Sequence, residues 1–253
     1  MLTELLDDVR AEHVELVRIV AEADLDVLVP AEPWDIRDTA SHLMVGDAKG
    51  LLAASDPEGF AAELPQVIAD PTGYLEHWLE AGRGLSRAEL VRQWNEGFEQ
   101  MVAAFAELPA GTKVPWYGPP MSPLSFATAR LMEYWAHGQD VVDALGITRV
   151  PTARLKHIAH LGVRTRGFSY AVRGLTPPEG EVRVTLTAPD GGVWEWGSGD
   201  DAVQGTAEDF CLRVTQRRHR ADTGLVTTGP LADDWMDHAQ CFAGLPTEGR
   251  AKQ

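Results

Sequence analysis

Apolar side chains recur at helical spacing throughout the first half of the chain. The period is about 3.6 residues, which is typical of amphipathic helices that bury one face. Residues suited to cap a helix precede three of these patterns: Asp35, Ser86 with Glu89 three positions later, and Ser122 followed by Pro123. The patterns therefore predict long helices over residues 2–23, 35–54, 86–105 and 122–145.

The connections between these helices are rich in proline and glycine, which interrupt helices. The first break is Pro-Ala-Glu-Pro at residues 30–33, and a second proline-rich loop covers residues 109–120. In residues 56–84 we expect a long connection that holds one short helix near 74–79. Four long helices joined in this way predict a four-helix bundle, an architecture that builds metal sites from inward side chains of facing helices.

The pattern changes in the second half of the chain. Residues 181–188 alternate between apolar and polar side chains, and the chain returns along 193–196 after a glycine turn, which predicts a hairpin. We also expect helices over 152–172, 206–214 and 233–242, and a strand over 225–228. The sequence thus predicts an α+β protein, with a four-helix bundle over residues 1–150 and a small α+β domain over residues 151–253.

The charge of the chain is strongly negative. Lys and Arg number 22 against 38 Asp and Glu, for a formal net charge of −16. Nucleic acids and anionic membranes attract basic surfaces, so this balance argues against either as the main partner. The acidic N-terminus and the lack of an apolar run of ~20 residues predict neither a secretory signal nor a membrane span. With only Cys211 and Cys241, we expect a cytoplasmic protein with buried, reduced thiols.

Three residues of the bundle carry the most specific chemical signal. Glu133 and His137 lie four positions apart within the helix predicted over 122–145, which places them on one face. His42, in the helix predicted over 35–54, is a residue that could close a metal site with them from across the bundle. Two imidazoles and a carboxylate without cysteine are typical of an open metal site that keeps a position for water or substrate. The alternative is a buried polar cluster that satisfies its own hydrogen bonds.

Two motifs carry a family resemblance, the first with Trp34, Asp38, His42 and Leu43, the second with Arg130, Glu133, His137 and Asp140. Together and in this order, they resemble the DinB-like metal-binding superfamily, and within it the mycothiol-dependent maleylpyruvate isomerase group. That family pairs a four-helix metal-binding bundle with a C-terminal α+β domain similar to sterol-carrier proteins. In the second half, residues 205–218 resemble the family's C-terminal helix, which leads to an arginine.

The resemblance implies a divalent metal, usually zinc, held by His42, Glu133 and His137, and a low-molecular-weight thiol, mycothiol, as cosubstrate. In the isomerase the metal lowers the pKa of the thiol, and the thiolate adds to a conjugated double bond, permits rotation and leaves. In relatives the thiol forms a lasting thioether. The loop Trp-Tyr-Gly-Pro-Pro at residues 116–120 and the acidic C-terminal part depart from the family pattern, so the identity of the substrate does not carry over.

Further residues are candidates for the same site. Asp140 lies one turn beyond His137 and is expected either to orient that imidazole or to face solvent. His13 falls on the apolar stripe of the first helix, where a core histidine is the alternative to a residue that contacts substrate. Arg217 and Arg218 belong to a dense basic cluster. Their guanidinium groups match a carboxylate of substrate or thiol, and a solvated face is the alternative.

Three hypotheses for the function follow. The favoured one is a metal-dependent enzyme that uses the thiol for S-transfer or cis-trans isomerisation of a small organic substrate. The second is a metal-dependent hydrolase in which metal-bound water is the nucleophile. The third is a non-catalytic module that binds a metal or a small molecule. All three have small-molecule partners, with no nucleic acid and no membrane, and they leave open whether the protein is a monomer or a dimer.

Overall fold

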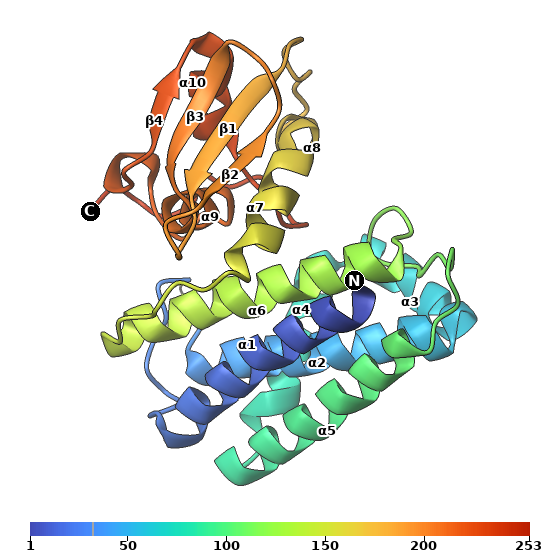
Figure 1. The fold of residues 1–253 in the computed structure, drawn as a ribbon. Helices are drawn as coiled ribbons and strands as arrows, with labels where there is room; N and C mark the ends of the chain where they lie inside the picture. Colours follow the sequence, from blue (N-terminus) through green and yellow to red (C-terminus); the bar gives the residue numbers. More distant parts are fainter. Residues whose placement is uncertain (32) are drawn as a thin grey trace. The chain divides into compact units, whose positions relative to one another are not determined.

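The computed structural model describes residues 1–31 and 33–253, so Glu32 of the first predicted break lies outside the described residues. The chain divides into two compact units, Met1–Thr148 and Arg149–Gln253. The first unit is helical, and the second combines helices with a sheet (Figure 1). This content confirms the predicted α+β class. None of the described helices is long and apolar enough to span a membrane.

The first unit contains the four predicted long helices and two shorter ones. The side chains of Asp35, Ser86 and Ser122 each accept a hydrogen bond from the backbone N–H three positions later, which caps a long helix as the sequence predicts. The helices are α1 (Leu2–Glu22), α2 (Ile36–Ser55), α3 (Pro57–Ala69), α4 (Pro71–Arg83), α5 (Arg87–Ala106) and α6 (Pro123–Leu145).

The segment between α2 and α5 differs from the prediction. It forms two consecutive helices, α3 and α4, and not a long connection with one short helix. Both helices begin in the same way: Asp56 and Asp70 cap the N–H three positions later, and Pro57 and Pro71 follow them at the first helical position. Proline starts a helix at this position, because the missing N–H has no partner within the helix in any case.

The first unit is packed around α2. This helix packs mainly against α5 and α4, whereas α6 packs mainly against α1 (Figure 1). The backbones of α2 and α6 approach each other closely at few positions. The predicted apolar stripes form the core, which includes the buried aromatic side chains of Trp94, Phe98, Phe105, Phe126 and Tyr134. The spacing of α2 and α6 is important because these helices carry the candidate metal ligands.

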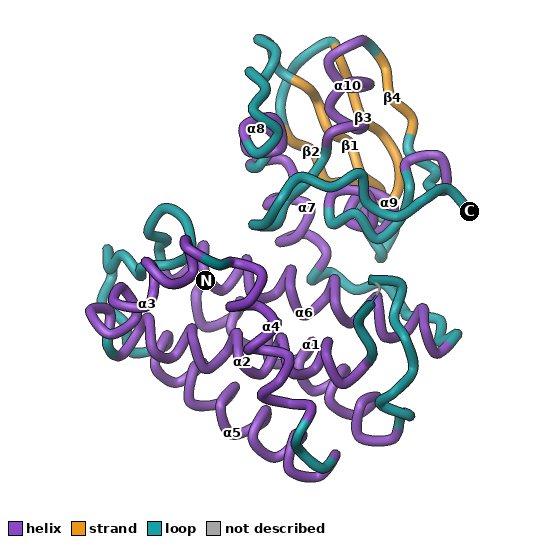
Figure 2. The backbone as a smooth tube through the Cα atoms, turned by 180° about the vertical axis from the view of Figure 1, so that it is seen from behind, coloured by secondary structure: helices purple, strands orange, loops and turns teal. Residues whose placement is uncertain are grey.

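The second unit is a small sheet with helices packed on it. Its elements are α7 (Leu155–Arg164), α8 (Arg166–Ala171), β1 (Val182–Thr187), β2 (Val193–Trp196), β3 (Asp201–Thr206), α9 (Ala207–Val214), the 3-10 helix η1 (Arg220–Asp222), β4 (Val226–Thr228) and α10 (Pro230–His238). The strand order is β2-β1-β3-β4, with β1 and β3 parallel and the other neighbours antiparallel. Both α9 and α10 contact the sheet (Figure 2).

Three features of the second unit correct the prediction. The helix expected over residues 152–172 is divided at Thr165 into α7 and α8. The strand β3 was not expected, since Asp-Ala-Val-Gln-Gly-Thr has small residues and no alternating pattern. Finally, α10 begins at Pro230 and ends at His238, so it starts before the expected range of 233–242. Here too, proline occupies the first turn of a helix.

Candidate metal centre

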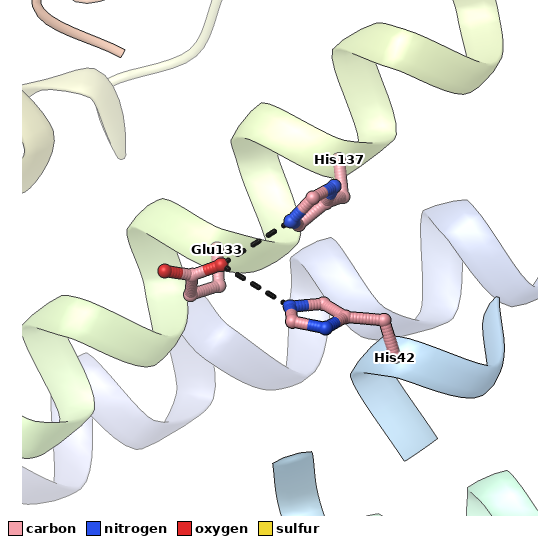
Figure 3. Close-up of side chains that lie close together, drawn as sticks. All are labelled: His42, Glu133 and His137. Atoms are coloured by element: carbon pink, nitrogen blue, oxygen red, sulfur yellow. Dashed lines mark ion pairs between the residues drawn. The ribbon is translucent and has the colours of Figure 1, made fainter. Parts of the chain in front are cut away.

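Three side chains from two helices of the first unit converge on one point. His42 comes from α2, and Glu133 and His137 come from successive turns of α6 (Figure 3). Glu133 Oε2 lies 3.3 Å from His137 Nε2 and 3.7 Å from His42 Nε2. One ligand atom from each residue lies within 4.8 Å of the other two. The structure thus brings together the three residues that the sequence nominates as metal ligands.

Local structure fixes the direction of these side chains. Because α6 continues without a break through Glu133 and His137, both side chains stay on one face of the helix. Next to His42, α2 is tied to α4: the Ser41 hydroxyl donates to the carbonyl oxygen of Trp78 at 2.6 Å. A Cβ at Gly82 would lie only 2.6 Å from the Ser41 Cβ, so glycine permits this close approach of the two helices.

The donor set and its spacing fit a divalent metal. A tetrahedral zinc ion with bonds of about 2.0–2.1 Å holds its ligand atoms roughly 3.3–3.4 Å apart. The two distances to Glu133 Oε2, 3.3 and 3.7 Å, are close to this separation. The side chains of His42, Glu133 and His137 are 18%, 25% and 11% exposed, so the cluster is largely buried. Three protein ligands leave at least one position for water or substrate.

The environment favours the protonation states that bind metals. Burial lowers the pKa of His42 to about 4, so this imidazole is neutral near neutral pH. Burial by itself raises the pKa of Glu133, but the hydrogen bonds and charges of His137 and His42 outweigh it and hold this pKa well below its ordinary value. A neutral imidazole and an ionised carboxylate are the forms that coordinate a metal.

A carboxylate and two tryptophans surround the three candidate ligands. Asp140 is 1% exposed, and its Oδ2 lies 3.4 Å from His137 Nδ1, the ring nitrogen that does not face Glu133. The Trp34 ring lies 5.2 Å from the ring of His42 and 5.8 Å from that of His137. From α4, the aromatic ring of Trp78 lies 5.6 Å from the His42 ring. Trp78 was not nominated from the sequence, because no pattern placed α4 beside α2.

Comparison with known proteins identifies the family of this bundle. The family model described as the mycothiol maleylpyruvate isomerase N-terminal domain matches residues 6–142, more than half of the chain. The chain belongs to this family. All three candidate ligands lie within the matched region of the mycothiol maleylpyruvate isomerase family.

Two proteins of Mycobacterium tuberculosis, uncharacterized proteins Rv0036c and MT0041, are each 43% identical to the chain over 248 residues, which cover 96% of both sequences. The crystal structures of the mycothiol-dependent maleylpyruvate isomerase and of a histidine-to-alanine mutant give TM-scores of 0.56 and 0.55. They are 15% and 16% identical to the chain and cover 92% of it and 96% of their own length. At this level of identity they support the α+β fold alone.

Two other residues considered from the sequence have partners of their own within the mycothiol maleylpyruvate isomerase domain. His13 is 1% exposed, and its ring nitrogens lie 3.1 Å from the Tyr134 hydroxyl and 2.8 Å from Asn95 Oδ1. Burial lowers the pKa of His13 to about 4. These contacts favour the core alternative, and contact of His13 with substrate stays a prediction. Asp38 accepts hydrogen bonds from Arg83 at 2.8 and 3.1 Å.

The candidate arginines belong to the second unit, outside the matched family domain. Arg217 Nη1 donates to the carbonyl oxygen of Thr215, and Arg218 Nη1 donates to that of Arg217, both at 2.7 Å. The neighbouring Arg220 donates instead to Thr227 Oγ1 at 2.7 Å and pairs with acidic side chains of α10. The side chain of Arg220 thus has partners within the second unit. Binding of a carboxylate by Arg217 and Arg218 stays a prediction.

Proposed function

We propose that the protein is a metal-dependent isomerase or S-transferase that acts on a small organic substrate with a low-molecular-weight thiol, for which mycothiol is the favoured candidate. The observation that carries the proposal is the convergence of His42, Glu133 and His137 in a member of the mycothiol maleylpyruvate isomerase family. A protein of the same fold is mycothiol-dependent, which supports the choice of thiol.

In this proposal His42, Glu133 and His137 hold one divalent ion, and zinc is favoured because two imidazoles and a carboxylate suit it. When bound, such an ion lowers the pKa of a thiol, so that a strong nucleophile is available near neutral pH. The chain contributes a neutral His42 through burial. Asp140 attracts the proton on His137 Nδ1 and thereby directs Nε2 of that ring toward the other ligands.

The substrate is positioned by residues around the triad. Trp34 and Trp78 place aromatic rings beside the imidazole of His42, and their apolar faces suit a flat, unsaturated part of a small molecule. Beside the triad we therefore expect a substrate with a flat, unsaturated segment. Separately, within the second unit, we assign Arg217 and Arg218 to bind a carboxylate of a small-molecule ligand, because the guanidinium group matches that geometry.

The thiol is tested by spectroscopy on cobalt-loaded protein. Mycothiol, or a simpler cysteinyl analogue, is expected to add charge-transfer absorption in the near ultraviolet, because a sulfur ligand reaches an open position. Binding should also release a proton as the thiol ionises. The His42→Ala variant is the control and should show no such band. A spectrum unmoved by millimolar thiols, with hydrolysis of an ester or amide still present, would support the hydrolase hypothesis.

Glu133→Gln is expected to weaken metal binding and to leave the bundle folded. The amide has nearly the same shape but lacks the negative charge, so we expect the affinity for the metal to fall on the order of 100-fold, at the upper end of what changes around metal ligands produce. The apolar core that stabilises the helices is unaffected. Chelator competition measures the affinity and circular dichroism measures the helices. Loss of helical signal with metal present would make Glu133 a structural residue.

Arg217→Ala and Arg218→Ala are expected to separate ligand binding from metal binding. Removal of a charged hydrogen-bond donor should weaken the binding of a carboxylate ligand by about tenfold or more. Metal content should stay the same, since neither arginine is a candidate ligand. Titration calorimetry with maleate, a small unsaturated dicarboxylate, measures the effect, and Arg183→Ala, at an exposed position of β1, is the matched control. If all three variants bind the carboxylate ligand with equal affinity, the assignment of Arg217 and Arg218 to carboxylate binding is wrong.

A further inference from the structure

The helices that carry the candidate ligands are joined by few direct contacts. Helix α2 packs mainly on α5 and α4, and α6 mainly on α1. One direct contact is apolar: Gly50 leaves room for the ring of Phe126, whose Cζ would lie 2.8 Å from a Cβ at Gly50. A second contact is a polar cluster made of Asp47, Arg130 and Tyr134. The alignment of His42 with Glu133 and His137 therefore depends on a small set of residues.

The polar cluster joins α2 to α6 through buried charged groups. Asp47 is fully buried and Arg130 is 5% exposed. Arg130 Nη2 donates to Asp47 Oδ1 at 2.7 Å and to the carbonyl oxygen of Leu43 at 3.2 Å. Leu43 directly follows His42, and Leu43 and Asp47 lie one turn apart on α2. A single guanidinium group from α6 thus spans the turn of α2 that adjoins the candidate ligand.

The other oxygen of Asp47 is bound by α6 as well. The Tyr134 hydroxyl donates to Asp47 Oδ2, and it accepts a hydrogen bond from Trp94 Nε1 at 2.8 Å. The ring of His13, which lies 3.1 Å from the same hydroxyl, packs beside it. Both carboxylate oxygens of Asp47 are therefore bound by residues of α6, and Tyr134 is itself held by α1 and α5.

Arg130 and Tyr134 are neighbours in sequence of the candidate ligands on α6. Over two turns of α6, residues of the polar cluster (Arg130 and Tyr134) alternate with residues of the metal triad (Glu133 and His137). A slip of α6 along α2 by one turn, ~5.4 Å, would separate both the cluster and the triad. We propose that Asp47, Arg130 and Tyr134 are positioning residues, which fix the register of α2 and α6 and so hold His42 opposite Glu133 and His137.

The position of Gly46 supports this proposal independently. A Cβ at Gly46 would lie 2.9 Å from Arg130 Nη1 and 3.4 Å from its Cζ. Glycine is unfavourable inside a helix, and here its missing side chain leaves the space that the guanidinium group fills. A buried ion pair is also a poor source of stability compared with apolar packing, whereas such pairs can specify register. The space at Gly46 and the ion pair between Asp47 and Arg130 therefore both favour one alignment of α2 and α6.

The proposal rests on the proposed metal site, and the test separates the two. In the Asp47→Leu/Arg130→Met double variant, apolar side chains replace the ion pair, a change that buried pairs often tolerate. We expect the variant to fold and to bind zinc at least about tenfold more weakly in chelator competition. The matched control, Lys49→Met/Glu63→Leu, removes an ion pair of 2.6 Å between α2 and α3 and should bind zinc normally. Gly46→Ala, which keeps both charges, should give a smaller loss.

The register itself is measured without metal. Spin labels at Ala48 of α2 and Ser125 of α6, both exposed, report the distance between the helices. The distance distribution should shift or broaden in the Asp47→Leu/Arg130→Met variant and stay as in the wild type in the Lys49→Met/Glu63→Leu control. Normal zinc affinity or an unchanged distance in the double variant would overturn the proposal. If the wild-type protein binds no metal, the proposed function fails, while the label distance still decides whether the cluster sets the register.

Discussion

Replacing His42 or His137 by alanine is expected to remove the metal from the protein and to leave its helices intact. Each change deletes one of the three candidate ligands, so the affinity for the metal should fall by more than about 100-fold. This loss is larger than that caused by substitutions of residues that only contact the ligands. His42 contributes little to the core, which is made of the apolar stripes of the helices. Elemental analysis after dialysis against a weak chelator should find near-unit stoichiometry in the wild type and almost none in the variants.

A matched histidine control makes this result specific. His77→Ala changes an imidazole of α4 whose side chain is 81% exposed, and it should leave the metal content unchanged. Circular dichroism of all the variants should show the same helical signal. Full occupancy in the His42→Ala/Glu133→Ala/His137→Ala triple variant would place the metal elsewhere and refute the assignment of the three ligands.

Asp47→Ala is expected to destabilise the first unit by about 3–5 kcal/mol, because removing one partner of a buried pair leaves the other charge uncompensated. The stranded charge is the guanidinium group of Arg130, which is 5% exposed. Burial raises the pKa of Asp47, and the charge of Arg130 and the hydrogen bond from Tyr134 oppose this effect. Denaturant unfolding of metal-free protein, followed by circular dichroism, measures the loss.

An exposed ion pair of the same kind gives the comparison. Arg10 donates to Glu99 at 3.0 and 3.1 Å, but their side chains are 37% and 55% exposed. Surface pairs contribute only about 0–1 kcal/mol, so Glu99→Ala should have a small effect. If Asp47→Ala destabilises the protein no more than Glu99→Ala does, the buried pair does not hold the bundle as its geometry indicates.

Much of the fold follows from local signals in the sequence. Asp35, Ser86 and Ser122 mark the starts of long helices because a capping side chain acts within three residues of itself. The same rule applies at Asp56 and Asp70, where the following proline suggests a break and instead starts a helix. Strand β3 was missed for a different reason: it is stabilised by pairing with β1 and β4, and pairing partners leave no pattern within the strand itself.

The residues of the candidate site also fall into two groups, those that signals in the sequence predict and those that they do not. Glu133 and His137 could be paired from their spacing, since four residues on a helix fix their proximity, and His42 joined them through the family resemblance. Trp78 and Asp47 carried no such signal. Their proximity to the site depends on how α4 and α6 pack on α2. Periodicity describes positions within one helix and does not predict which helices lie side by side.

His42 and Glu133 also have a consequence for the unfolded chain, because about 90 residues separate them and a metal shared between them closes a long loop. Such a loop forms rarely in the unfolded ensemble, so an ion bound as proposed would act as a reversible crosslink. Its binding free energy would then add to the folding free energy of residues 1–148, the unit that supplies all three candidate ligands. Metal supply would thus change the stability of residues 1–148.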